Sequence, residues 1–213
     1  MRAPVAPALR NDHRQAVSFD AVDAAWFRAI NRLQARTAWA HPAARWYAKD
    51  GIVLFGVLLV VAWLWRRRDG EADVEGVAAV VGTGVAIFAA LGLGQVIGHA
   101  VHRARPYAAM PYVHVLVART HDFSFPSDHA TAVGAVAVGL LLCAWPLGWV
   151  AAGLAALMAI TRVYAGAHYP ADVVAGLVLG GAVAALVVAA ARRALTPVLR
   201  AALGTPLRLL IAR

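Results

Sequence analysis

The sequence predicts an all-α membrane protein, a polytopic bundle of five transmembrane helices preceded by one amphipathic helix at the membrane interface. Two observations predict this class. Hydrophobic residues make up 62% of the 213-residue chain, whereas soluble domains are roughly half apolar, and the mean hydropathy is +0.66. The apolar residues also gather in five segments without a Pro/Ser-rich linker between them. We therefore expect one integral membrane domain.

The five apolar segments set the order of the predicted spans, namely 52–65, 77–97, 130–145, 147–163 and 173–191. The first is shorter than the ~20 residues that cross a bilayer, so it must borrow residues 46–51 or cross where the bilayer is thin. Pro146, with Gly148 close by, separates the third and fourth segments and predicts a tight helical hairpin. Gly176 and Gly180 form a GxxxG pattern, which indicates close packing of the fifth helix.

The two ends of the chain differ from this apolar part. Residues 1–17 are polar and lack the apolar stretch of a cleavable signal peptide, so we expect a flexible N-terminal segment there. Residues 19–33 place apolar and charged side chains on opposite helical faces, which predicts an amphipathic helix lying at the interface. Its apolar face would carry Phe19, Val22, Trp26, Ala29, Ile30 and Leu33. We assign residues 18–193 to the membrane domain and 194–213 to a basic amphipathic tail.

The net charge of +9 raises the question of nucleic-acid binding. The arginines, however, follow apolar segments directly at Arg66–Arg68 and Arg192–Arg193, as they do in cytoplasmic loops. No zinc-finger spacing accompanies them, so we expect the bilayer, and no nucleic acid, as a partner. This orientation places residues 98–129 and 162–172 on the extracytoplasmic side of the cell membrane. The basic residues between positions 28 and 49 run against it.

The second of these outer segments pairs a histidine with an aspartate at a helix start. Pro170 suits the first turn of the fifth helix, so His168 precedes that helix and Asp172 lies in its first turn. At this spacing the carboxylate can reach back to one imidazole nitrogen, fix the tautomer and leave the other nitrogen free to attack. Arg162, at the end of the fourth helix, offers a fork of donors that matches phosphate oxygens.

The first outer segment contains the stretch SFPSDHA at the start of the third helix. Ser127 has the character of an N-cap, and a helix N-terminus with free amide groups favours anions. His129 could then protonate a leaving oxygen. Asp128 would repel a phosphate, and it could raise the pKa of a neighbouring imidazole.

Together these residues resemble the type 2 phosphatidic acid phosphatase superfamily, the lipid phosphate phosphatases. That family carries the motifs Lys-x6-Arg-Pro, Pro-Ser-x-His and Ser-Arg-x5-His-x3-Asp. The second is intact at 126–129, and the third is present from Thr161 to Asp172 with Thr in place of Ser. The first survives as Arg105-Pro106, but Gly98 stands where the lysine belongs. The phosphate contact of that lysine would fall to Arg103, His102 or His99, or would not be needed.

The resemblance implies a six-helix phosphatase core and a covalent mechanism without metal or cofactor. His168 would be the nucleophile that forms a phosphohistidine, Asp172 would orient it, and His129 would be the general acid and then the general base. The residues that would bind substrate are Arg105, Arg162, Ser127, Asp128 and Arg103.

The residues 27–33 and SFPSDHA further resemble undecaprenyl-diphosphatases of the bacitracin-resistance type, which implies a polyprenyl diphosphate substrate and recycling of the cell-wall carrier lipid. Two alternatives stay open. The substrate could be another lipid phosphate, such as phosphatidylglycerophosphate, phosphatidic acid or a polyprenyl phosphosugar phosphate. The protein could also be a non-catalytic binder or transporter of lipid phosphates, although a nucleophile with an orienting carboxylate argues against it.

Overall fold

The computed structural model describes residues 19–68 and 73–211, so the predicted flexible segment at 1–17 lies outside the described residues. The described part is helical and contains no strand. Its α-helices are α1 (Phe19–Arg36), α2 (His41–Asp50), α3 (Ile52–Arg66), α4 (Val74–Val101), α5 (Pro106–Ala109), α6 (Asp128–Cys143), α7 (Trp145–Tyr164), α8 (Pro170–Ala202) and α9 (Arg208–Ile211). A 3₁₀ turn, Ala38–Ala40, joins α1 to α2. The predicted all-α class is therefore confirmed.

Each of the five predicted apolar segments forms a helix. Helices α4, α7 and α8 are long and apolar enough to cross a membrane, whereas α6 is a shorter apolar helix of 16 residues. The first segment is long and apolar enough for a span only together with residues 38–50, and the chain bends by 56° between the two parts. At the other end α8 continues to Ala202 with Pro197 inside it, so the boundary that we assigned at residue 193 falls within this helix.

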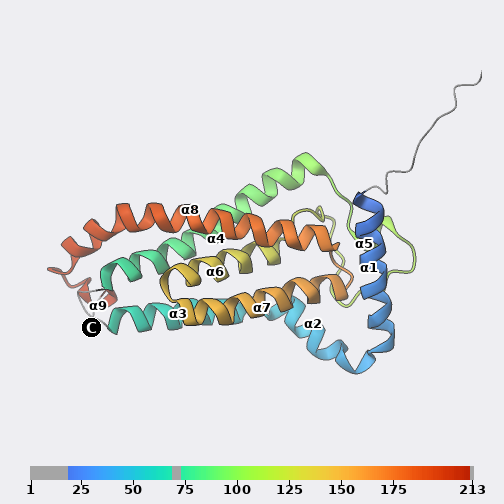
Figure 1. Ribbon diagram of the computed structural model, residues 1–213, viewed down its shortest axis with the longest axis horizontal. Coiled ribbons are helices and arrows are strands. Elements are labelled where there is room, and N and C mark those ends of the chain that lie inside the picture. Colours follow the sequence, from blue (N-terminus) through green and yellow to red (C-terminus); the bar gives the residue numbers. More distant parts are fainter. Residues whose placement is uncertain (1–18, 69–72, 212–213) are drawn as a thin grey trace, which may run out of the picture.

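The long helices α3, α4, α6, α7 and α8 run along one axis, and α1 crosses one end of the bundle at a steep angle to them (Figure 1). Much of the predicted apolar face of α1 points away from the protein, since Val22, Trp26 and Leu33 are exposed, whereas Ile30 packs partly against the core. The face against the bundle carries Phe27 and Asn31, both buried. A helix that lies across the bundle end with its apolar face outward fits the predicted interfacial position.

Helices α6 and α8 approach each other through glycines. A Cβ atom on Gly180 would lie 1.9 Å from the carbonyl oxygen of Thr131, and one on Gly134 would lie 2.6 Å from that of Leu177. Both distances are far below van der Waals contact, so only glycine fits, and the predicted close packing at the GxxxG pattern is confirmed. This contact fixes the start of α6 relative to the start of α8.

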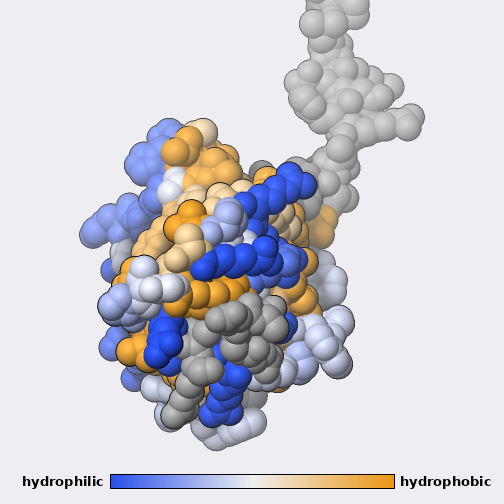
Figure 2. Space-filling model, turned by 90° about the vertical axis from the view of Figure 1, so that its left-hand side faces the viewer, coloured by the Kyte–Doolittle hydropathy of each residue, from blue (hydrophilic) through white to orange (hydrophobic). Residues whose placement is uncertain are grey.

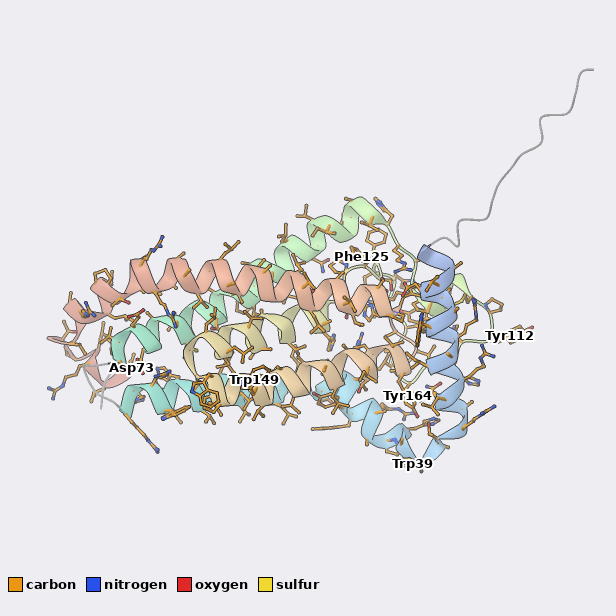
Figure 3. All side chains as sticks on the ribbon, viewed as in Figure 1. Trp39, Asp73, Tyr112, Phe125, Trp149 and Tyr164 are labelled. Carbon is orange, nitrogen blue, oxygen red and sulfur yellow. The ribbon has the colours of Figure 1, made fainter. Side chains whose placement is uncertain are left out.

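The opposite end of the bundle holds the hairpin between α6 and α7 and much of the basic charge. Arg66 donates to the carbonyl of Cys143, and Arg192 donates to that of Leu142 at 2.5 Å. Both arginines thus satisfy carbonyls of the last turn of α6, where positive charge also complements the helix dipole. Figure 2 looks onto this end and shows hydrophilic groups gathered among apolar ones. In Figure 3, Asp73 marks this end, and Phe125 and Tyr112 lie toward the other.

Candidate active site

A polar pocket of about 290 Å³ opens at the α1 end of the bundle. Five predicted site residues line it, namely Arg105, Asp128, His129, Arg162 and His168. They come from the loop before α5, the start of α6, the end of α7 and the loop before α8. The other predicted site residues do not line this pocket. Ser127 and Asp172 are fully buried, and Arg103 lies beside Asp172.

The imidazole of His168 is held in one tautomer by its neighbours. Its Nε2 lies 3.0 Å from Nη1 of Arg105 and 3.2 Å from Nη2 of Arg162. Because a guanidinium group has donors only, Nε2 must be the acceptor and carries the lone pair. Nδ1 then bears the proton and donates it to the carbonyl of Ser124 at 2.8 Å. The lone pair of Nε2 therefore faces the pocket between two cations.

Burial, together with the nearby arginines, lowers the pKa of His168 to about 4, although Asp172 acts in the opposite direction. A buried imidazole resists the charged form, and two guanidinium groups beside it resist it further. The ring is therefore neutral at physiological pH. A neutral imidazole with a free Nε2 is the form that a nucleophile needs.

Asp172 does not hold His168 in the way that its spacing predicts. Its Oδ2 lies 3.8 Å from Nδ1 of His168, beyond hydrogen-bond distance. The carboxylate instead accepts from the hydroxyl of Ser124 at 2.5 Å and from the amide of Tyr169 at 2.8 Å. Arg103 donates to its other oxygen at 2.7 Å. Asp172 therefore fixes Ser124, whose carbonyl orients the imidazole, and it contributes its own charge from close by.

The predicted role of Arg103 in binding substrate does not fit its position. Its guanidinium bridges two carboxylates, Asp172 at 2.7 Å and Asp23 at 2.6 Å. It also lies over the ring of Tyr169, 4.1 Å from the centroid. Asp23, on α1, accepts in addition from the amide of Ala171 at the start of α8. The structure thus predicts that Arg103 positions Asp172 and does not contact the substrate.

Arg105 is bound on both edges of its guanidinium group. Nε and Nη2 donate to Asp122 at 3.1 and 2.8 Å, and Nη1 donates to the carbonyl of Ala167 as well as to His168. Partial burial would raise the pKa of Asp122, but hydrogen bonds from Thr120 and Arg105 outweigh it and lower this pKa. The carboxylate is therefore charged and orients Arg105 from the pocket rim.

Ser127 is the N-cap of α6, as predicted, because its hydroxyl accepts from the amide of Ala130 at 3.5 Å. Its own amide donates to the carbonyl of Asp172 at 3.0 Å, which ties the starts of α6 and α8 together. This contact places the first residues of α6, Asp128 and His129, at the pocket. The carboxylate of Asp128 accepts from Gln95 on α4.

Sequence reasoning missed four polar residues of the site. They are Asp23, Lys49, Asp122 and Ser124. Ser124 lies within SFPSDHA, yet nothing in its spacing distinguishes it from a loop serine. Asp23 lies on α1 and Lys49 on α2, and only the packing of these two helices brings them to the site. Within the described ranges no group of three or more His, Cys, Asp or Glu residues could hold a metal ion.

Comparison with known proteins agrees with this geometry. The PAP2 superfamily model matches residues 79–195, more than half of the chain. The bacitracin transport permease protein BcrC of Bacillus licheniformis is 32% identical over 77% of this chain and 78% of its own length. Undecaprenyl-diphosphatase BcrC of Bacillus subtilis (strain 168) is 28% identical over 72% and 76%. Decaprenylphosphoryl-5-phosphoribose phosphatase of Mycobacterium tuberculosis is 37% identical over 64% and 70%.

The fold has a solved counterpart as well. The crystal structure of a transmembrane PAP2-type phosphatidylglycerolphosphate phosphatase from Bacillus subtilis superposes with a TM-score of 0.59 at 21% identity, covering 85% of this chain and 89% of that one. Identity this low establishes the shared fold alone. With the family match and the relatives at substantial coverage, the chain belongs to the PAP2 superfamily of membrane lipid phosphatases.

Proposed function

We propose that the protein removes the terminal phosphate of a polyprenyl diphosphate through a phosphohistidine intermediate. The observation that carries the proposal is the lone pair of His168 Nε2, which faces the pocket between Arg105 and Arg162 at 3.0 and 3.2 Å. Two guanidinium groups around a neutral imidazole nitrogen suit a phosphoryl group, because they can pass their hydrogen bonds from the nitrogen to the phosphate oxygens.

In the first step Nε2 of His168 attacks the terminal phosphorus, a nitrogen–phosphorus bond forms, and the bond to the bridging oxygen breaks. His129 lines the same pocket and gives its proton to the bridging oxygen, so that lipid monophosphate leaves. In the second step a water molecule attacks the phosphohistidine and His129 takes its proton. Inorganic phosphate leaves and His168 is regenerated. The proposed sequence uses no metal ion or cofactor.

The other polar residues would serve these steps from fixed positions. Arg105 and Arg162 neutralise the charge that spreads over the phosphoryl oxygens in the transition state. The start of α6, capped by Ser127, adds amide groups and a positive dipole end beside the pocket. Asp172 and Ser124 hold the Nδ1 side of the ring, so that attack occurs from Nε2.

An apolar groove supports a lipid substrate. It has a volume of about 620 Å³, lies between α1 and α8, and is lined by residues such as Trp26, Phe125 and Val178. Phe125 also lines a small cavity of about 170 Å³, which shares Asp122 and Asp128 with the catalytic pocket. We place the hydrocarbon chain along this path from the pocket to the exposed face of α8.

The names of the relatives support a polyprenyl lipid as substrate, and the charge pattern supports the side of the membrane on which the pocket lies. Relatives named as undecaprenyl-diphosphatase and decaprenylphosphoryl-5-phosphoribose phosphatase both act, by their names, on polyprenyl carriers. Arg66 and Arg192 lie at the end of the bundle opposite the pocket, and basic ends face the cytoplasm. We therefore place the pocket on the extracytoplasmic side, where it would recycle the cell-wall carrier lipid.

A phosphate-release assay in detergent tests the proposal. The panel holds undecaprenyl diphosphate, phosphatidylglycerophosphate, phosphatidic acid and decaprenylphosphoryl-5-phosphoribose. We expect the diphosphate to be hydrolysed fastest, and we expect His168→Ala to release no phosphate while it elutes like the native protein. A faster rate on another lipid would reassign the substrate. Activity in His168→Ala would refute the covalent mechanism, and binding without release from any lipid would favour a non-catalytic role.

A further inference from the structure

Position 98, where the family's first motif carries a lysine, leaves little room for a side chain in this protein. A Cβ atom on Gly98 would lie 3.1 Å from the carbonyl oxygen of Phe125, so even a methyl group presses on the loop. Gly98 also lines the small neighbouring cavity and not the catalytic pocket. The phosphate contact that the family's lysine would make is therefore absent from this part of α4.

The three substitutes nearest in sequence do not reach the pocket. Arg103 is bound between Asp23 and Asp172. His99 lines the neighbouring cavity and packs its ring edge-on against Phe123. His102 packs against the same phenyl ring, 4.7 Å between centroids.

A cation does reach the pocket from a different helix. Lys49, in the last turn of α2, lines the pocket together with His129, Arg162 and His168. It is the only lysine in a sequence whose other nineteen basic side chains are arginines. Among the residues that the structure describes it forms no ion pair, whereas Arg105 is already paired with Asp122.

The backbone of α2 holds Lys49 firmly at this rim. Arg162 donates to the carbonyl of Ala48 at 3.0 Å, and the hydroxyl of Tyr47 donates to the carbonyl of Leu154 on α7 at 2.7 Å. Lys49 and His129 line the same pocket, together with Arg162, which bonds to α2. The backbone of the lysine is thus held at the pocket that also contains His129, the group that would protonate the leaving oxygen.

We infer that Lys49 binds the leaving phosphate of a diphosphate substrate and makes the enzyme prefer diphosphates to monophosphates. The inference rests on the proposed function. In a diphosphate the bridging oxygen, protonated by His129, is attached to the second phosphorus, so the second phosphate lies next to His129. This second phosphate is an anion both before and after the bond to the bridging oxygen breaks. An unpaired ammonium group there stabilises that charge, whereas a lipid monophosphate releases an alcohol and presents no anion to Lys49.

The test compares farnesyl diphosphate with farnesyl monophosphate in detergent, using Lys49→Gln, Lys49→Arg and the matched control Arg45→Gln. Arg45 is exposed, lies one turn earlier on α2 and does not line the pocket. We expect Lys49→Gln to lower kcat/KM for the diphosphate by about tenfold or more, as loss of a hydrogen bond to a charged group does. The monophosphate should change little, Lys49→Arg should retain most of the preference, and Arg45→Gln should match the native protein. An equal loss on both substrates, or no loss, would overturn the inference.

A binding measurement separates this inference from the proposed function. Acetic anhydride acetylates accessible amines, and Lys49 is the only lysine, so one modified site can be followed by mass spectrometry with the N-terminal amine as internal reference. A methylene-bridged analogue of farnesyl diphosphate should protect Lys49, and farnesyl monophosphate should not. Protection without phosphate release from either lipid would refute the catalytic function and keep the diphosphate site. Hydrolysis without protection would refute the role of Lys49 alone.

Discussion

Arg103 offers the sharpest test of how the site is held in place. The sequence predicts that Arg103 binds phosphate, whereas the structure predicts that it positions Asp172. The change is Arg103→Met, which keeps an unbranched side chain and removes the charge. It leaves two carboxylates without their cation, since the side chain of Asp172 is 0% exposed and that of Asp23 is 4% exposed. Breaking a buried ion pair by removing one partner costs about 3–5 kcal/mol. We expect the unfolding free energy in detergent to fall by about this amount.

Loss of Arg103 should also slow catalysis. Without its cation Asp172 should shift, and with it Ser124, whose carbonyl orients His168. A displacement of about 1 Å at a reacting group costs up to about 100-fold in rate, so kcat should fall while KM stays nearly constant. In Asp23→Asn the amide oxygen still accepts from Ala171 while one charge of the network is lost. The double variant Asp23→Asn/Arg103→Met should therefore lose less stability than the sum of the two single variants, by about 1–3 kcal/mol.

The assay is phosphate release against lipid concentration together with denaturant unfolding followed by tryptophan fluorescence. Arg103→Lys serves as a second variant, because a lysine presents a point charge and cannot bridge two carboxylates as a guanidinium does. If Arg103→Met raised KM alone, with unchanged stability and kcat, Arg103 would be a phosphate ligand, and the positioning role would be refuted.

Three further predictions follow from the geometry. The pKa of His168 is lowered to about 4 in the native protein. Between pH 6.5 and 4, His168 is therefore protonated in the unfolded chain but neutral in the native chain. The contribution of His168 to the unfolding free energy is complete above pH 6.5 and is lost as the pH falls toward 4. His168→Asn should remove this dependence of the unfolding free energy on pH, as measured in a pH series of unfolding experiments. Gly180→Ala puts a Cβ atom 1.9 Å from the carbonyl of Thr131 and should destabilise the protein by about 1–3 kcal/mol or more, whereas Gly84→Ala, with nothing within 4 Å, should be neutral or stabilising; equal effects would contradict the close contact. Ala175→Trp fills the groove between α1 and α8 and should raise KM for undecaprenyl diphosphate without slowing p-nitrophenyl phosphate hydrolysis, and an unchanged KM would remove this groove from the path of the lipid.

The sequence determined those parts of the site that depend on neighbours within one helical turn. Pro170 begins α8, His168 precedes it and Asp172 lies in its first turn, as the spacing predicts. Ser127 caps α6 and brings His129 to its first turn. Helix starts follow short-range rules of capping and backbone dihedrals, and long apolar runs mark candidate spans, so these features could be read in chain order.

Only the tertiary structure decided which side chains meet across helices. The spacing of His168 and Asp172 suggests direct contact. The Asp172 carboxylate instead accepts hydrogen bonds from Ser124, Tyr169 and Arg103, and the imidazole donates to the carbonyl of Ser124. Asp23 lies on the charged side of α1 in any helical projection, but its pairing with Arg103 depends on how α1 crosses the bundle. Lys49 likewise reaches the pocket because Arg162 holds the end of α2. Such contacts depend on the exact positions of whole helices, which are set by packing and buried ion pairs between segments that are distant in the sequence.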